Sequence, residues 1–188
     1  MNGLDTTILL WINHWPNWLY GVFIIFSHGF KWLWFKTILL SIAAFLLIKN
    51  STRKAATIAF ISFIMANTFT HYFKKWIAFK RPCVVIPDEL IQRVDFLRES
   101  YGTTSAHAAN MMAIAVVFTY YWKGKGVPWI FIALMTGLSR IYFGLHYPSQ
   151  IFLGFGVGIL SAYLSIKIVE KFLFLRTHPS KVIDEKRY

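Results

Sequence analysis

Charged residues are scarce in this chain. Only 15% of its 188 residues are charged, whereas a soluble domain usually carries about 25%. Hydrophobic residues make up 56% of the chain, and the mean hydropathy is +0.50. That much apolar surface exceeds what one soluble core of this size can bury, so the composition favours an integral membrane protein.

Cysteine is limited to Cys83, which excludes an internal disulfide and a thiolate metal site. The first residues lack a basic start followed by a small-residue cleavage site, so we expect no cleaved signal peptide. The sequence also lacks low-complexity segments and clear internal repeats. We therefore expect a single membrane-embedded domain over residues 1–188.

Acidic residues are few, eight against twenty lysines and arginines, and the net charge is +12. In a soluble protein this excess would suggest binding to nucleic acid. Here the cations gather at the ends of apolar runs, where membrane topology and anionic headgroups account for them better. We expect the lipid bilayer, and no nucleic acid, as a partner.

Long apolar segments recur along the chain, most of them close to the roughly 17–25 residues that a helix needs to cross a bilayer. Residues 4–15 alternate apolar and polar types and predict an N-terminal interfacial helix. The next segment, 18–30, is short for a crossing and is either tilted or partly interfacial. Five clearer crossings follow, at residues 32–48, 55–73, 105–122, 127–138 and 149–169. The sequence predicts an all-α, polytopic membrane helix bundle with about six transmembrane helices.

Basic residues predict the orientation of this bundle. The connections 49–54 and 123–126 and the C-terminal tail are rich in Lys and Arg and are separated by two crossings each. The positive-inside rule puts all three in the cytoplasm, together with the C-terminus. Segments 74–104 and 139–148 then meet on the outer face. Both segments are therefore expected outside the membrane, opposite the C-terminus.

Three polar clusters on that face combine cations with histidines and hydroxyls: "KKWIAFKRP" (74–82), "TSAH" (104–107) and "SRIYFGLHYPSQ" (139–150). None of them contains a carboxylate, which suits an anionic substrate. Arg offers phosphate oxygens a planar fork of donors, and Lys offers a point charge. Hard divalent cations need several carboxylate oxygens, so we expect metal-independent chemistry with no cofactor.

The spacing within these clusters resembles the three signature motifs of the type 2 phosphatidic acid phosphatase superfamily, K-x6-RP, PSGH and SR-x5-H-x3-D. The match covers residues 74–150, and all three motifs occur in the right order. The resemblance implies that His146 attacks phosphorus to form a phosphohistidine and that His107 protonates the leaving lipid oxygen. It also implies a set of groups that hold the phosphoryl oxygens: Lys74, Arg81, Ser105, Arg140 and the backbone N–H near Ala106.

Gln150 stands where the family has the Asp that orients the nucleophilic His. A Gln carbonyl can accept the same hydrogen bond but brings no charge. We therefore expect one of two outcomes. Either activity survives with a less basic His146, or a carboxylate from the outer loop, Asp95 or Glu99, substitutes for the missing one. At the second motif Thr104 and Ala106 replace Pro and Gly, which is tolerable if the φ angle of Ala106 is negative.

The sequence and this resemblance thus predict a metal-independent lipid phosphatase that cleaves a lipid phosphate monoester or diphosphate at the outer face of the bilayer. We expect it in a bacterial inner membrane, with the active site facing the periplasm or exterior. An envelope lipid such as undecaprenyl diphosphate, lipid A phosphate or phosphatidylglycerol phosphate is the expected substrate. Two alternatives stay open: a lipid phosphotransferase that uses the same phosphohistidine, and a catalytically silent lipid-binding protein, which Gln150 makes conceivable. Lys75 and Lys80 are expected to meet headgroups or solvent, whereas His71, one turn before Lys74, could line the site.

Overall fold

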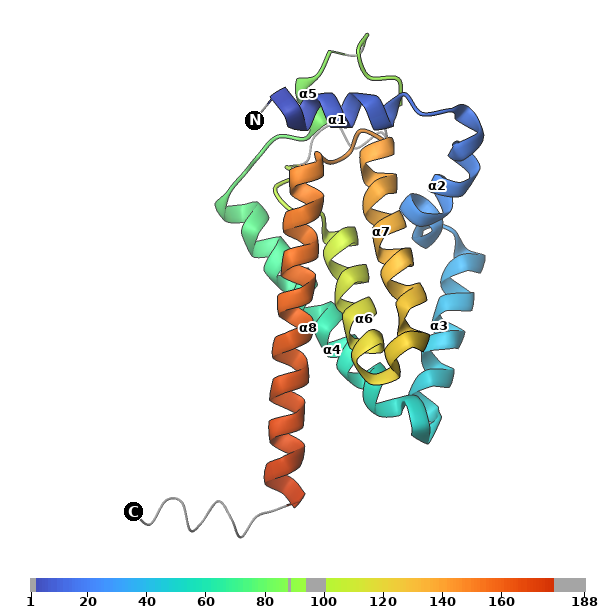
Figure 1. The fold of residues 1–188 in the computed structure, drawn as a ribbon, viewed down its shortest axis with the longest axis vertical. Coiled ribbons are helices and arrows are strands. Elements are labelled where there is room, and N and C mark those ends of the chain that lie inside the picture. The colour runs from blue at the N-terminus through green and yellow to red at the C-terminus, as the bar shows by residue number, and fades with distance from the viewer. Residues whose placement is uncertain (1–2, 88, 94–100, 178–188) are drawn as a thin grey trace.

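The computed structural model describes residues 3–87, 89–93 and 101–177, and it contains helices but no strand within these ranges (Figure 1). Five longer helices form the bundle: α3 (Leu33–Ile48), α4 (Asn50–Trp76), α6 (Ala106–Trp122), α7 (Val127–Tyr142) and α8 (Pro148–Thr177). The all-α prediction is confirmed.

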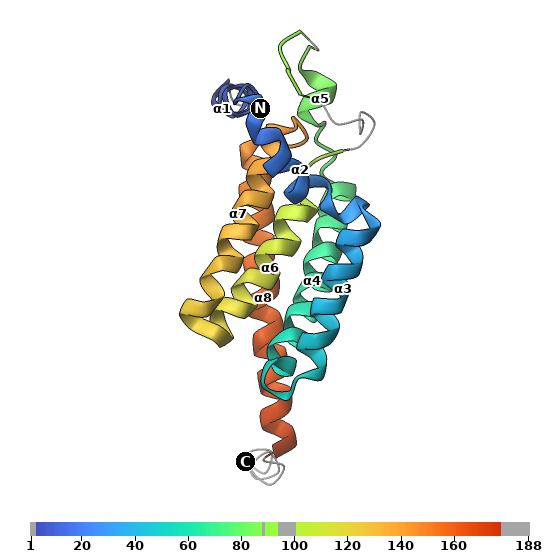
Figure 2. The same ribbon diagram turned by 90° about the vertical axis from the view of Figure 1, so that its right-hand side faces the viewer.

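Shorter helices gather at one end of this bundle. They are α1 (Gly3–Asn13), α2 (Tyr20–His28) and α5 (Pro82–Val85). The 3₁₀ turns Asn17–Leu19 and Gly29–Lys31 flank α2, whereas the turn Lys123–Gly126 connects α6 and α7. Helix α1 lies across the end of the bundle instead of along it (Figures 1 and 2). It exposes Leu4 and Trp11 and buries Leu9 and Ile12, as an amphipathic interfacial helix should.

Helix α6 is the centre of the bundle and packs against α4, α7 and α8. Small residues allow this close packing, because Ala109 and Ala113 of α6 are fully buried against its neighbours. At Gly158 of α8 an added Cβ would lie 2.4 Å from the carbonyl oxygen of Ala109. Only glycine lets the two backbones approach so closely, which is how apolar helices without bulky interface residues associate.

One helical segment in the described part of the chain, Pro148–Leu173, is long and apolar enough by itself to cross a membrane. A second qualifies if the segments Asn17–His28 and Leu33–Ile48, which meet at a bend of 56°, are counted as one span. Many large apolar side chains on the outside of the bundle are exposed, including Leu33, Phe60 and Phe152. The count of six crossings stays a prediction, although a helix occupies each of the six predicted segments.

Two helices continue further than the apolar pattern indicated. Helix α4 runs through Lys74 to Trp76, and α7 runs through Arg140 to Tyr142. The prediction of a turn beginning at residue 139 is therefore wrong, since the connection between α7 and α8 is limited to residues 143–147. Helix α7 can continue because its polar residues find partners, and the Ser139 hydroxyl donates to the Thr136 carbonyl at 2.7 Å.

Candidate active site

His146 lies in the turn between α7 and α8 and is only 2% exposed. Its Nδ1 is 3.0 Å from Gln150 Oε1 and 3.2 Å from the carbonyl oxygen of Gly102. A backbone carbonyl can only accept, so Nδ1 carries the proton and donates to both oxygens. The lone pair of the neutral ring is then on Nε2, the atom that is left for chemistry.

Gln150 is the third residue of α8, and its side-chain oxygen accepts two hydrogen bonds. Its Oε1 accepts from His146 and also from the backbone N–H of Tyr147, at 3.2 Å. Tyr147 directly precedes the helix, so the second contact is the reciprocal half of a capping box. The same contact fixes which amide atom faces the imidazole. Gln150 therefore orients His146 through a neutral acceptor, which is the geometry that the sequence left open.

Gly102 closes the site from the other side. A Cβ at this position would lie 2.8 Å from Arg81 Cγ, 3.3 Å from Gln150 Oε1 and 3.4 Å from His146 Nδ1. Only glycine brings the backbone close enough for its carbonyl to bind the imidazole without displacing Arg81. Gly102 is also tied to the first cluster, residues 74–82, because its N–H donates to the carbonyl of Phe79 at 2.8 Å.

Arg140 lies in the last turn of α7 and is only 4% exposed. Its Nη1 donates to the Ser27 hydroxyl at 2.7 Å and to the Ser27 carbonyl at 3.2 Å. Ser27 is at the end of α2 and is itself buried. The sequence analysis missed this residue. The available signal was the polar pair Ser27-His28 within an otherwise apolar segment.

Arg81 and Lys74 complete the cationic part of the site. Arg81 is 6% exposed and directly precedes α5, and its Nη1 is 3.5 Å from the carbonyl of Leu145, the residue before His146. Lys74 is half-buried at the end of α4. Burial, and then the charges of Arg81 and Arg140, lower the pKa of His146 well below its ordinary value of 6.5. The imidazole is therefore neutral at neutral pH, the form in which Nε2 can attack.

The second motif forms the start of α6. Ser105 is buried before the first turn, and its hydroxyl accepts from the Ala108 N–H at 3.4 Å, the position of an N-cap. Lys123 is the one non-glycine residue with a positive φ in the described ranges, so the condition on Ala106 is met. His107 is half-buried in the first turn and faces the charges of Arg140, Lys74 and Arg81.

The starts of α6 and α8 are joined directly. The N–H of Ser105 donates to the backbone carbonyl of Gln150 at 3.3 Å. The structure thus brings all three motifs together at one end of the bundle, from elements 74–81, 102–107 and 140–150. Lys75 and Lys80 are exposed, as expected for residues that meet headgroups or solvent. His71, which the sequence suggested could line the site, is exposed as well. Asp95 and Glu99, the predicted substitutes for the missing carboxylate, lie outside the described residues.

The sequence matches the PAP2 superfamily over residues 55–174. Among curated relatives, the lipid A 4'-phosphatase of Porphyromonas gingivalis is 28% identical over 172 residues, which cover 81% of this chain and 70% of that protein. The undecaprenyl-diphosphatase of Sulfolobus acidocaldarius is 26% identical over 168 residues, which cover 89% of this chain and 76% of that protein.

A solved structure shares the fold. The crystal structure of Aquifex aeolicus LpxE superposes with a TM-score of 0.75 at 21% identity, covering 88% of this chain and 96% of that one. The matched family region contains all three motifs, which the fold brings to one end of the bundle. The resemblance that the motifs indicated is confirmed, and the chain belongs to the PAP2 superfamily.

Proposed function

We propose that the protein hydrolyses a membrane lipid phosphate monoester or diphosphate through a phosphohistidine at His146. The observation that carries this proposal is the neutral, buried imidazole, whose Nδ1–H is held by Gly102 and Gln150 while Nε2 keeps its lone pair. The enzyme class, a phosphoric monoester hydrolase acting on lipids, follows from the family and from the lipid phosphatases among its relatives.

In the first half of the reaction, Nε2 of His146 attacks phosphorus and the bond between phosphorus and the lipid oxygen breaks. His107 donates a proton to that oxygen, so the lipid leaves as an alcohol, or as a lipid monophosphate when the substrate is a diphosphate. In the second half, His107 takes a proton from water, whose oxygen attacks the phosphohistidine and releases phosphate. The chain regains both histidines in their starting forms.

The cations stabilise the transferring group. Arg140, Arg81 and Lys74 surround His146, and their charges offset the negative charge on the equatorial phosphoryl oxygens. Ser27 and Leu145 orient the two guanidinium groups through neutral oxygens. Ser105 and the backbone N–H groups at the start of α6 add anion affinity from the positive end of that helix.

Gln150 orients the nucleophile but leaves its positive charge uncompensated. After attack, the phosphorylated imidazole is cationic, and a neutral amide stabilises that cation less than a carboxylate does. The amide nevertheless keeps the ring in the productive tautomer, which is one of the functions of an orienting group. The contact therefore favours an active enzyme over a silent binder.

The substrate class we favour is an envelope lipid. The named relatives act on lipid A and on undecaprenyl diphosphate, and both have lipid-linked phosphates at a membrane surface. The basic connection at Lys123–Gly126 and the start of α4 lie at the opposite end of the bundle from the turn between α7 and α8, which contains His146 (Figure 2). With that end in the cytoplasm, the site faces the outer leaflet of the inner membrane.

Phosphate release by the purified protein tests this proposal. We would supply lipid A phosphate, undecaprenyl diphosphate and phosphatidylglycerol phosphate in detergent with a chelator, beside His146→Ala. His71→Ala is the matched control, because it removes an exposed histidine from α4. We expect release by the wild-type protein and by His71→Ala but not by His146→Ala. Full activity in His146→Ala would refute the proposal, and labelled phosphate in a lipid product would indicate transfer instead.

A further inference from the structure

Helix α1 is attached to the segment that carries the nucleophile. The Asp5 carboxylate accepts from the Ser149 backbone N–H at 3.0 Å and also from the Ser149 hydroxyl. The two residues are 144 positions apart in the sequence. Ser149 directly precedes Gln150, so this contact fixes the start of α8 next to the residue that orients His146.

Asp5 supplies a hydrogen-bond acceptor for an N–H group at the start of α8. The first N–H groups of a helix have no partner within the helix and need one from elsewhere. Gln150 satisfies the N–H of Tyr147, and Asp5 satisfies the N–H of Ser149. The N-cap position is Tyr147, whose side chain has no short acceptor for this purpose. A carboxylate there also interacts favourably with the positive end of the helix.

Two further contacts hold α1 over the turn between α7 and α8. Leu9 and Ile12 are buried in one cluster with Leu145 of that turn. At the end of α1, the buried Asn13 amide donates to the Tyr142 carbonyl at 2.8 Å. Helix α1 therefore spans the His146 turn and contacts the end of α7 on one side and the start of α8 on the other (Figure 1).

We propose that Asp5 is a positioning residue for the nucleophile, acting through α8 and Gln150. The Gln150 side chain has one more rotatable bond than the Asp that the family has at this position. Its neutral amide also binds the imidazole less strongly than a carboxylate would. Asp5 compensates by fixing the backbone from which Gln150 extends. Asp5 itself does not touch His146. The inference rests on the proposed function for its catalytic consequence, although the contact between α1 and α8 is independent of it.

Kinetics of Asp5→Ala test the consequence for catalysis. We expect kcat to fall about ten- to a hundred-fold, as for a small misplacement of a reacting group, with KM within about twofold of wild type. Glu170→Gln is the matched control, since it removes a carboxylate from the end of α8 remote from Asp5 and Ser149, and it should leave kcat unchanged. An unchanged kcat in Asp5→Ala, or a fall confined to KM, would overturn the proposal.

A second variant keeps the test valid if Asp5→Ala folds poorly. This variant combines Asp5→Cys and Ser149→Cys in a Cys83→Ser background, because the two side chains are hydrogen-bonded in the structure. Its activity is compared after oxidation and after reduction, with disulfide formation verified by mass spectrometry. Oxidation should restore most of the kcat that the reduced form has lost, because a covalent link replaces the hydrogen bonds. Equal activity in the joined and separated forms would contradict a positioning role.

Amide hydrogen exchange distinguishes this proposal from the proposed function. In Asp5→Ala the amides of residues 149–151 should exchange faster than in wild type, whether or not a substrate is known. Unchanged exchange would show that Asp5 does not hold α8 and would overturn the inference. A wild-type protein that releases no phosphate from any lipid refutes the proposed function instead.

Discussion

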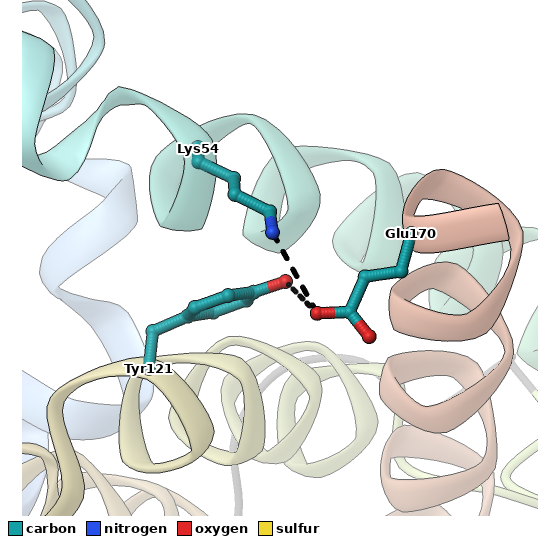
Figure 3. A network of polar contacts seen from close by, with 3 residues as sticks. All are labelled: Lys54, Tyr121 and Glu170. Carbon is teal, nitrogen blue, oxygen red and sulfur yellow. Dashed lines mark hydrogen bonds and ion pairs between the residues drawn. The ribbon is translucent and has the colours of Figure 1, made fainter. Parts of the chain in front are cut away.

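The same three helices carry polar residues at both ends of the bundle, with opposite consequences. At the end remote from His146, Lys54 of α4, Tyr121 of α6 and Glu170 of α8 meet (Figure 3). The tyrosine hydroxyl donates to Glu170 Oε1 at 3.0 Å, and Lys54 Nζ is 3.7 Å from the same oxygen. At the other end α4, α6 and α8 contribute Lys74, His107 and Gln150.

The difference lies in what surrounds each cation. Lys54 is half-exposed and has a carboxylate partner, so its charge is largely cancelled, and such a pair contributes about 0–1 kcal/mol to stability. Arg81 and Arg140 are almost fully buried and donate to neutral oxygens of Leu145 and Ser27. These described contacts orient the two guanidinium groups through neutral oxygens. The comparison distinguishes cations that tie helices together from cations arranged for an anion.

Among the variants that keep His146, Arg140→Ala should have the largest effect, because it removes a buried charge that we propose stabilises the phosphoryl group. We expect kcat/KM to fall by about 10²–10³-fold, as when an electrostatic stabiliser is deleted from an active site. Lys54→Ala, the corresponding change at the remote end, should stay within about twofold, since the described contacts of its charge, with Glu170 and the Tyr121 ring, both lie at the end remote from His146. Steady-state kinetics of both variants measure these losses. Equal losses of kcat/KM in the two variants would contradict the distinction between the two ends of the bundle.

Gln150→Leu removes the orienting acceptor and keeps the approximate volume. We expect a loss of about 10²-fold in kcat, smaller than the roughly 10⁴-fold effect of losing a sole orienting partner, because the Gly102 carbonyl still binds Nδ1. Rate measurements under saturating lipid check this value. Wild-type activity in Gln150→Leu would mean that Gly102 alone orients the ring.

Gln150→Asp should move the pH dependence of the reaction. In the wild-type protein the lowered pKa keeps His146 neutral well below pH 6.5, so the acidic limb of kcat/KM lies below that value. A carboxylate beside Nδ1 favours the protonated ring and raises this pKa, which shifts the acidic limb to higher pH. A pH profile that stays unchanged in Gln150→Asp would show that another group sets the limb.

Glu170→Gln should have the smallest effect. The amide still accepts from Tyr121, and only the partly exposed pair with Lys54 is lost, so the free energy of unfolding should change by about 1 kcal/mol or less. Denaturation in detergent and phosphate release measure the two quantities. A large loss of activity with intact stability would make the remote cluster part of the site.

Much of this architecture could be predicted from the sequence, because apolar runs and motif spacing are local signals. The six apolar segments each contain a helix, and the motif residues meet at one end. The exact ends of α4 and α7 could not be predicted, since both helices continue through polar residues whose partners lie elsewhere. Gln150 was recognised as a departure, but its dual contact depends on the conformation of Tyr147.

Ser27 and Asp5 were missed for a different reason. Their partners, Arg140 and Ser149, lie 113 and 144 residues away, and no periodicity links residues at such separations. Both come from the N-terminal segment that precedes the matched family region, residues 55–174. The three sequence motifs all lie within that region and therefore gave no information about Ser27 or Asp5. The fold packs the N-terminal helices against the motif residues.

The central claim is that Nε2 of His146 becomes covalently phosphorylated, and direct detection of the phosphoenzyme tests it. The protein would be mixed with a lipid substrate labelled in its phosphate, quenched in alkali to preserve a phosphorus–nitrogen bond, and mapped by peptide mass spectrometry. We expect label on His146 in the wild-type protein and none in His146→Ala. Label on a different residue, or turnover by His146→Ala at the wild-type rate, would contradict it.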